Sequence, residues 1–194
     1  KQNSRVAIFR QALAIDERRR MFRNYNWNEG QDFHPTRFGK TNRPQDSKQV
    51  WFSGVHADVG GGYTEDESAL SKFPLDWMLW EAEAAGARLS ASMRRHLVDG
   101  RKLPNGKQAY VAPDPAGPLH KSLTLGWWPA EFVPKKLKWR RWPKRSSNSG
   151  FYFPLTEPRF IPEGALVHRS VQQRIEKVGD YKPINLPSDH RIED

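Results

Sequence analysis

One segment constrains the fold of this 194-residue chain more than any other: an apolar run, a glycine-rich turn and a second apolar stretch follow one another directly. Residues 49–56 are apolar and β-branched and are bounded by turn residues, which predicts a β-strand covered on both faces. Three consecutive glycines at 60–62 favour a turn. Residues 70–89 then predict a helix whose apolar face is broad enough to require burial. This order of elements is typical of an α/β fold.

Two further helices are predicted outside this segment. Residues 5–23 carry apolar side chains at helical spacing, and a short helix is predicted from Ser170 to Lys177. Residues 99–118 are rich in turn residues, and Asn105-Gly106 between apolar residues indicates a hairpin. The predicted fold class is therefore α/β, with the strand of residues 49–56 flanked by the helices of residues 5–23 and 70–89.

Composition limits the classes of protein that the chain can belong to. With 37% hydrophobic residues, 8 Trp and 10 Phe, it has enough apolar surface to build a core, and its length fits a single domain, 1–194. The absence of cysteine excludes a disulfide framework, a thiolate metal site and a cysteine nucleophile. The formal net charge of +10 favours polyanionic partners such as anionic lipid or nucleic acid.

The histidine at the end of the predicted strand is a candidate catalytic residue. In open α/β sheets, ligands bind beyond the carboxyl ends of the strands, where His56 is expected. Its imidazole titrates near neutral pH, so His56 can serve as a general base. The alternative is a structural histidine whose ring is hydrogen-bonded to a loop carbonyl.

Three motifs, in the same order, resemble those of one protein family. The sequence VWFSGVHADVGGGY at residues 50–63 is close to the family pattern VWFPGVHSDVGGGY. Residues 12–19, ALAIDERR, and residues 161–168, IPEGALVH, are similar to two further family motifs. The family is an uncharacterised α/β-hydrolase family, a domain of unknown function that includes type VI secretion phospholipase effectors. The resemblance implies the C-terminal portion of an α/β-hydrolase-like fold.

The resemblance also implies the roles of individual residues in a Ser-Asp/Glu-His triad. It makes His56 the base, and Asp16, in the second motif, the acid that orients it. The acidic residues that precede His56 in this chain are Asp16, Glu17, Glu29, Asp32 and Asp46. The main rival to Asp16 is an Asp in a family Trp-Asp motif that lies farther upstream and is absent from these residues. Asp16 can instead be a helix-surface carboxylate paired with Arg19 or Arg20. Substrate or supporting contacts are assigned to four residues of the glycine-rich turn: Asp58, Gly60, Gly61 and Gly62.

One family feature is absent from these residues. The nucleophile elbow G-x-S-x-G occurs nowhere in the sequence, and the oxyanion hole that accompanies it is missing too. We therefore expect the chain to act together with an N-terminal half of the same protein that supplies the serine, and to be inactive alone. No cofactor and no metal ligand are predicted.

A basic, aromatic segment at residues 119–153 is predicted as an insertion or lid within the domain. Residues 135–145 hold seven Lys or Arg and no acidic residue. Three interpretations stay open: attraction to an anionic membrane surface, nucleic-acid binding, or a solvated loop with inward-facing tryptophans. The candidates for membrane contact are Lys135, Lys136, Lys138, Trp139, Arg140, Arg141 and Trp142.

The remaining histidines are not assigned to catalysis. His34 is considered for the approach to the active site, and His168 is predicted to pack inside a strand or helix entry. Solvated positions are predicted for His96, His120 and His190.

The leading function predicted from the sequence is a serine esterase of the phospholipase type that cleaves glycerophospholipid esters. The alternative is a non-catalytic membrane-docking or interaction module of the same fold. Phospholipid or a membrane surface is the predicted partner, and nucleic acid is not. The head group, the acyl position and the compartment are not indicated by the sequence.

Overall fold

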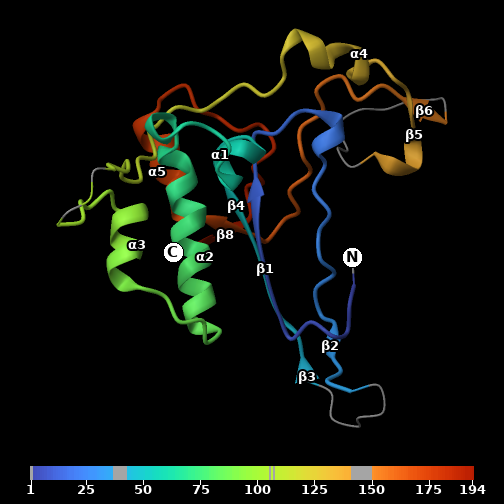
Figure 1. Cartoon of the computed structure of the whole chain (residues 1–194). Helices are drawn as coiled ribbons and strands as arrows, with labels where there is room; N and C mark the ends of the chain where they lie inside the picture. Colours follow the sequence, from blue (N-terminus) through green and yellow to red (C-terminus); the bar gives the residue numbers. More distant parts are fainter. Residues whose placement is uncertain (1, 37–42, 105, 107, 141–149) are drawn as a thin grey trace.

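The chain folds around a parallel sheet with helices on both faces. The computed structural model describes residues 2–36, 43–104, 106, 108–140 and 150–194. Four parallel strands form the sheet in the order β1-β4-β7-β8, and Figure 1 shows α2 alongside it. The predicted α/β fold class is therefore confirmed.

The helices and strands follow one another with long irregular connections between them. The main sheet consists of β1 (Ile8–Ala14), β4 (Asp46–Phe52), β7 (Ala165–His168) and β8 (His190–Glu193). The α-helices are α1 (His56–Gly60), α2 (Lys72–Ala84), α3 (Ala91–Leu97), α4 (Trp128–Glu131) and α5 (Arg169–Lys177). Two-residue strands pair as β2 (Asp32–Phe33) with β3 (Arg43–Pro44) and as β5 (Lys135–Lys136) with β6 (Phe151–Tyr152).

The helix predicted over residues 5–23 is wrong, because this segment forms β1 followed by a single 3₁₀ turn at Arg20–Phe22. Short apolar runs are compatible with both a helix and a strand, so periodicity alone could not separate them. Pairing decides the matter: β1 runs parallel to β4 over seven residues, from Ile8 opposite Asp46 to Ala14 opposite Phe52.

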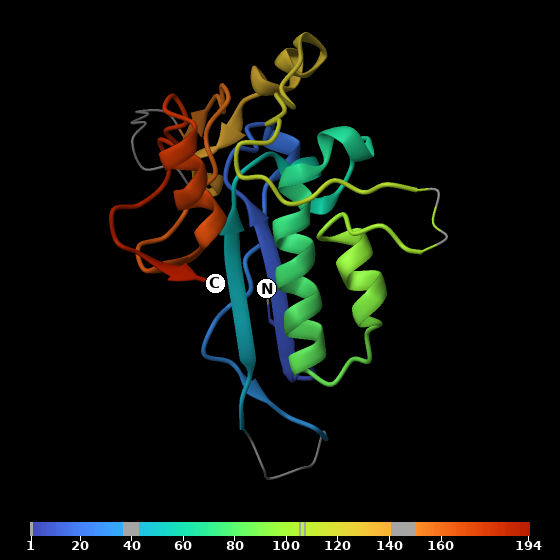
Figure 2. The same ribbon diagram turned by 90° about the vertical axis from the view of Figure 1, so that its left-hand side faces the viewer.

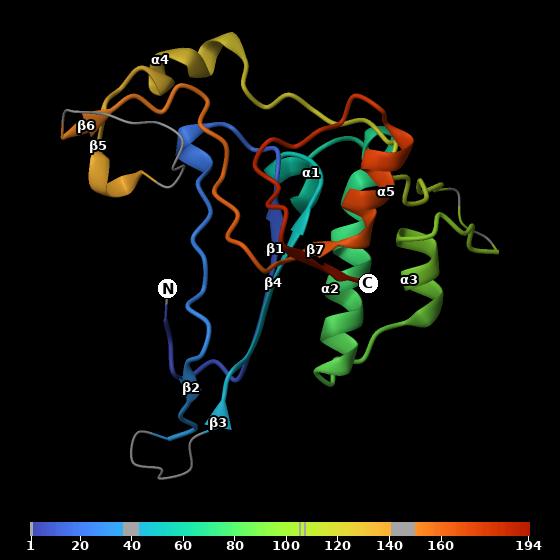
Figure 3. The same cartoon turned by 180° about the vertical axis from the view of Figure 1, so that it is seen from behind.

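Successive residues of β4 supply the two halves of the core. Val50 and Phe52 pack against Trp77 of α2 on one face of the sheet. Trp51, between them, faces the opposite side and packs in a cluster with Leu13 of β1 and Val171 of α5. Figures 2 and 3 show α2 and α5 from the side and from behind. A strand buried on both faces explains the continuous apolar run from which β4 was predicted.

The other predicted elements agree better with the structure, although some of their boundaries differ. β4 ends at Phe52, so His56 begins α1 and is not the last residue of the strand. The helix predicted over 70–89 is confirmed as α2, although it is shorter, and the helix predicted from Ser170 is confirmed as α5. Within 99–118, the described residues contain no strand, so the predicted hairpin is not formed there, although Asn105 and Lys107 lie outside the described residues.

A buried ionic network ties the sheet to α2. The Glu81 carboxylate, only 2% exposed, receives Arg10 Nε of β1 at 2.5 Å and Lys48 Nζ of β4 at 2.7 Å. Lys48 also contacts Glu193 of β8 at 2.7 Å. These bonds lower the pKa of Glu81 against the opposing effect of its burial. Because each charge is paired, the network fixes how three strands are placed against one helix.

We predict that Gly54→Ala destabilises the protein by about 2 kcal/mol or more. Gly54 has φ +109°, and a Cβ atom there would lie 2.5 Å from Cβ of Asp58. Gly60→Ala is the matched control, since a Cβ at Gly60 meets no atom within 4 Å. Thermal unfolding of the two variants checks this, and equal unfolding midpoints would contradict it.

Candidate active site

The carboxyl ends of β1 and β4 meet and bring two loops together. Beyond the strands, the backbone N–H of Ile15 donates to the Phe52 carbonyl at 3.0 Å, and that of Asp16 donates to the Gly54 carbonyl at 3.0 Å. Continuing the parallel pairing in this way places residues 16–17 beside residues 54–56. Figure 1 shows this edge of the sheet at α1, at the opposite end of β4 from β2 and β3.

At this edge a buried glutamate contacts the predicted base. His56 Nδ1 lies 2.7 Å from Glu17 Oε2. The Glu17 side chain is fully buried, whereas the His56 side chain is 40% exposed. A buried carboxylate behind a half-exposed imidazole is the arrangement that orients a catalytic histidine.

The contacts of Glu17 determine the tautomer of His56. An ionised carboxylate can only accept hydrogen bonds, so Nδ1–H of His56 donates to it. Arg19 Nη2 lies 2.9 Å from the same Nδ1 and 3.0 Å from Glu17 Oε2. Since Nδ1 carries a hydrogen, Arg19 Nη2 donates to the carboxylate and not to the ring. The lone pair of His56 Nε2 is then available to accept a proton.

Hydrogen bonds keep the Glu17 carboxyl ionised despite its burial. Burial raises its pKa, but bonds from Arg19, His56 and Ser122 outweigh that effect and lower the pKa to about 2. The Ser122 hydroxyl donates to Oε1 at 2.8 Å, and Arg19 Nε donates to the same oxygen at 3.0 Å. A carboxylate that stays charged can stabilise an imidazolium during proton transfer.

Aromatic side chains cover part of the pair. The Phe22 ring stacks on the His56 imidazole with centroids 4.4 Å apart. The Arg19 guanidinium lies 3.8 Å from the Phe22 ring centroid and 5.0 Å from that of Trp127. These contacts hold the imidazole in one orientation and keep Arg19 beside the carboxylate.

Asp16 does not contact the imidazole in this structure. Its Oδ2 accepts hydrogen bonds from the Gly54 N–H at 2.7 Å and from the Tyr181 hydroxyl at 2.9 Å. Burial raises the pKa of Asp16, while these two bonds act in the opposite direction. Asp16 was predicted because it lies in the second family motif, but in the loop after β1 the next residue of that motif, Glu17, contacts His56.

Asp58 forms a second carboxylate–histidine contact next to the first. Its buried Oδ1 lies 2.6 Å from His120 Nδ1, and its Oδ2 accepts the Val55 N–H at 2.9 Å. His120 stacks on Tyr63 with centroids 3.4 Å apart. These contacts are those of a carboxylate that supports the turn, and the prediction of a solvated His120 is wrong.

The other candidates lie in different surroundings. Gly60 and Gly61 line a hollow with Ser71 and Leu75, and His56 does not line it. Gly62 is exposed next to the C-terminal end of α1. Of the basic and aromatic candidates, Lys136 and Lys138 are exposed, and Lys135 and Arg140 are partly buried. The Trp139 side chain, Arg141 and Trp142 lie outside the described residues.

The remaining histidines are structural or remote. His168 ends β7, stacks on Phe52 and accepts the Ser170 N–H, and burial lowers its pKa to about 4. His96 is 5% exposed, so the prediction that it is solvated is wrong. His34 lies next to β2, at the far end of the sheet (Figure 1).

Within the part of the chain that the structure describes, no group of three or more His, Asp or Glu side chains could hold a metal ion. Over the same residues, no helix is long and apolar enough to cross a bilayer.

We predict that the acid stability of the protein depends on Glu17. Because its folded pKa is about 2, below the ordinary glutamate value of 4.5, its contribution is complete above pH 4.5 and is lost as the pH falls toward 2. The contribution is roughly 2–3 kcal/mol. Glu17→Gln should therefore lose less stability between pH 5 and pH 2 than the wild type, measured by denaturant unfolding. An unchanged pH dependence would contradict the assignment.

A comparison with protein-family models matches residues 1–81 to "T6SS, Phospholipase effector Tle1-like, catalytic domain". The match includes β1, β4 and α1, and therefore Asp16, Glu17 and His56. No curated protein and no solved structure matches the chain. Residues 1–81 are thus similar to the catalytic domain of the Tle1-like phospholipase effectors of type VI secretion, which agrees with the resemblance seen in the sequence motifs.

Proposed function

We propose that this chain supplies the base and the acid of a serine-type ester hydrolase that acts on glycerophospholipids, with His56 as the base and Glu17 as the acid. The single observation that supports this most strongly is the 2.7 Å contact between His56 Nδ1 and the buried Glu17 carboxylate. The remainder of the proposal follows from the chemistry of that pair.

In the proposed reaction, Nε2 of His56 takes the proton of a serine hydroxyl as its oxygen attacks the ester carbonyl carbon. The imidazolium that forms is stabilised by Glu17, and it then gives its proton to the leaving alcohol as the carbon–oxygen bond breaks. Water repeats the sequence on the acyl-enzyme and releases the fatty acid. Glu17 remains ionised throughout and holds Nδ1–H.

We propose that the serine comes from a segment outside these 194 residues. β1 lies at the edge of the sheet, and its outer side is not paired with any strand among the described residues. Such a seven-residue edge invites a further strand. A parallel strand added there would end beside Glu17 and His56, where a nucleophile is needed.

We expect His56→Ala to lower kcat for ester hydrolysis by the whole protein at least about 10³-fold, and Glu17→Gln by about 10²–10⁴-fold. Asp16→Asn is the matched comparison, because its carboxylate holds Gly54 and Tyr181 instead of the imidazole. It should mainly reduce thermal stability. The assay is hydrolysis of a phospholipid with released fatty acid as readout.

Two outcomes would revise this proposal. If Asp16→Asn lowers kcat by about 10²–10⁴-fold and Glu17→Gln lowers it only slightly, Asp16 is the acid. If His56→Ala retains full activity, or if the whole protein hydrolyses no ester, the alternative of a non-catalytic docking module is favoured.

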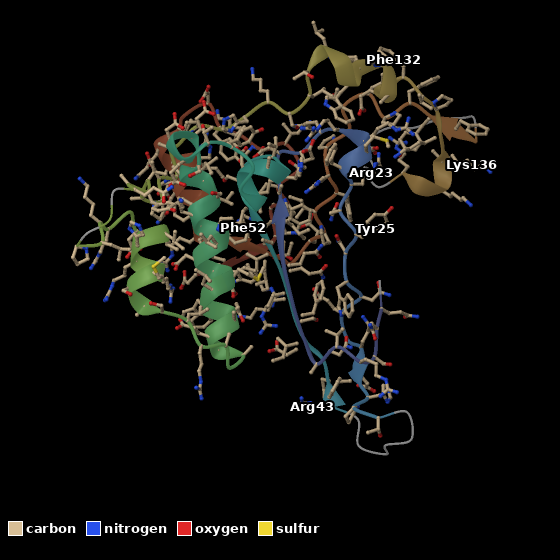
Figure 4. The ribbon with its side chains drawn as sticks, in the orientation of Figure 1. Arg23, Tyr25, Arg43, Phe52, Phe132 and Lys136 are labelled. Atoms are coloured by element: carbon tan, nitrogen blue, oxygen red, sulfur yellow. The ribbon has the colours of Figure 1, made fainter. Side chains whose placement is uncertain are left out.

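For the lipid itself, we propose a docking face on the outer part of the basic segment. Its apolar members are Leu125, which is 87% exposed, and Phe132, 57% exposed, together with Val133, Leu137 and Phe151. Lys136 and Lys138 lie among them and are also exposed. Exposed apolar patches mark interaction sites, and lysines next to them favour anionic lipid headgroups. Figure 4 labels Phe132 and Lys136 in this outlying part.

We expect Lys136→Gln with Lys138→Gln to weaken binding to phosphatidylcholine vesicles containing anionic phosphatidylglycerol by about 30-fold, since each lysine contributes about 1 kcal/mol. Phe132→Ser should weaken binding to neutral vesicles as well. Ile184→Ser is the control, because Ile184 is 62% exposed elsewhere on the chain. Cosedimentation measures binding. Unchanged vesicle binding, or tight binding to nucleic acid instead, would overturn the docking face.

A further inference from the structure

A cluster of cations lies between the catalytic pair and the docking face. We call it the cationic junction and define it by the cations Arg20, Arg23, Lys135, Arg140 and Arg159 and the carboxylates Glu131 and Glu157. It forms where the loop after Glu17 meets the segments around β5 and β6, and Figure 4 labels Arg23 there. None of these residues has a role in the proposed proton transfer.

Both carboxylates of the junction are buried and already paired. Glu131 accepts the backbone N–H of Arg20 at 2.7 Å and that of Thr156 at 3.1 Å. Glu157, whose side chain is 2% exposed, pairs with Arg23 Nη2 at 2.5 Å. Five cations in this defined set therefore face two carboxylates, so the junction carries excess positive charge.

Two arginines there have buried N–H groups without an acceptor. Arg20 donates its Nη1 to the carbonyls of Ala130 and Val133, but its Nε has no partner among the described residues. Arg140 lies over the Tyr152 ring at 5.9 Å, and its Nε and Nη2 have no partner in the described part of the chain either. A buried, unsatisfied charged donor is costly, so both groups favour an acceptor of negative charge.

The effect of this field is seen at Lys135. Burial and the charges of Arg23 and Arg20 lower its pKa to about 8, against the opposing influence of Glu131 and Glu157. Burial is the larger cause of this shift, and the two arginines act in the same direction.

A narrow hollow leads from the junction to the acid of the catalytic pair. It is lined by Arg19, Arg20, Arg23 and Arg159 together with Glu17 and Glu157. Its accessible space is about 10 Å³, which is enough for one oxygen-sized group and not for a whole headgroup.

We propose that the cationic junction binds a phosphate group, which inserts one oxygen between the arginines, and that its source is the phosphodiester of a glycerophospholipid. Guanidinium groups match phosphate in charge and in geometry, and several of them converge here. The choice of a lipid source rests on the proposed function. Held at the hollow, the phosphate would bring the acyl esters of the same glycerol to the side of the sheet where His56 lies.

The first test measures binding without turnover, in whole protein that carries His56→Ala. Inorganic phosphate and the soluble diester glycerophosphocholine should both raise Tm. Arg20→Gln should weaken binding of each ligand at least about 10-fold, since it removes a charge-assisted donor from the lining of the hollow. Arg169→Gln, at an exposed arginine paired with Asp194, is the matched control and should bind like its parent.

A second variant separates ligand binding from a structural role. At pH 7 the Lys135 ammonium is disfavoured in the folded state, because its folded pKa of about 8 lies below the ordinary lysine value of 10.5. Lys135→Gln should therefore raise Tm by roughly 2 °C in phosphate-free buffer and also reduce the rise that phosphate causes. The gain should shrink between pH 8 and pH 10.5, where the wild type loses this proton.

Each result decides a separate point. The phosphate site is overturned if neither ligand raises Tm, or if Arg169→Gln weakens ligand binding as much as the junction variant does. It is also overturned if Lys135→Gln lowers Tm in phosphate-free buffer. Binding of inorganic phosphate without glycerophosphocholine overturns the lipid source. In active protein, Arg20→Gln should lower kcat/KM about 10-fold for phospholipid and lower it less for a neutral diacylglycerol. If the protein binds phosphate but hydrolyses no ester, the proposed function is refuted and the phosphate site is retained.

Discussion

The parallel pairing of β1 with β4 is the constraint on which the rest of the structure depends. Its register sets Ala14 opposite Phe52, and two further backbone bonds continue it beyond the strands. A shift by one residue would turn Trp51 and Phe52 to the opposite faces of the sheet, away from the clusters in which they now pack. The same shift would part Glu17 from His56, so packing and chemistry are fixed by one set of bonds.

Buried charges are balanced by opposite charges and hydrogen bonds in one part of this molecule and not in another. At Glu17 and at Glu81, buried carboxylates have enough donors to stay ionised, and each joins segments that are distant in the sequence. At the cationic junction the balance is reversed, because guanidinium groups exceed the carboxylates that face them. The first arrangement stabilises the folded chain, whereas the second favours an anionic ligand. The two regions meet at the hollow next to Glu17.

Much of the fold and part of the site could be predicted from the sequence. The apolar run of β4 and the amphipathic patterns of α2 and α5 each carry a local signal, and all three elements are present. His56 was identified from its motif and its place after a strand. Glu17 was harder to choose, because adjacent acidic residues differ only in the direction of their side chains. Ser122 and His120 carried no signal, since their partners are 105 and 62 residues away.

The sequence by itself determined the fold class, the similarity of residues 1–81 to a family of phospholipase effectors and the choice of His56, because motifs and short-range periodicity are local properties. Only the tertiary structure decided that residues 8–14 are a strand and that Glu17 rather than Asp16 faces His56. It also decided that several arginines gather beside that pair. The physical reason is that strand pairing and the burial of charge depend on contacts between segments far apart in the chain, and no local pattern specifies those contacts.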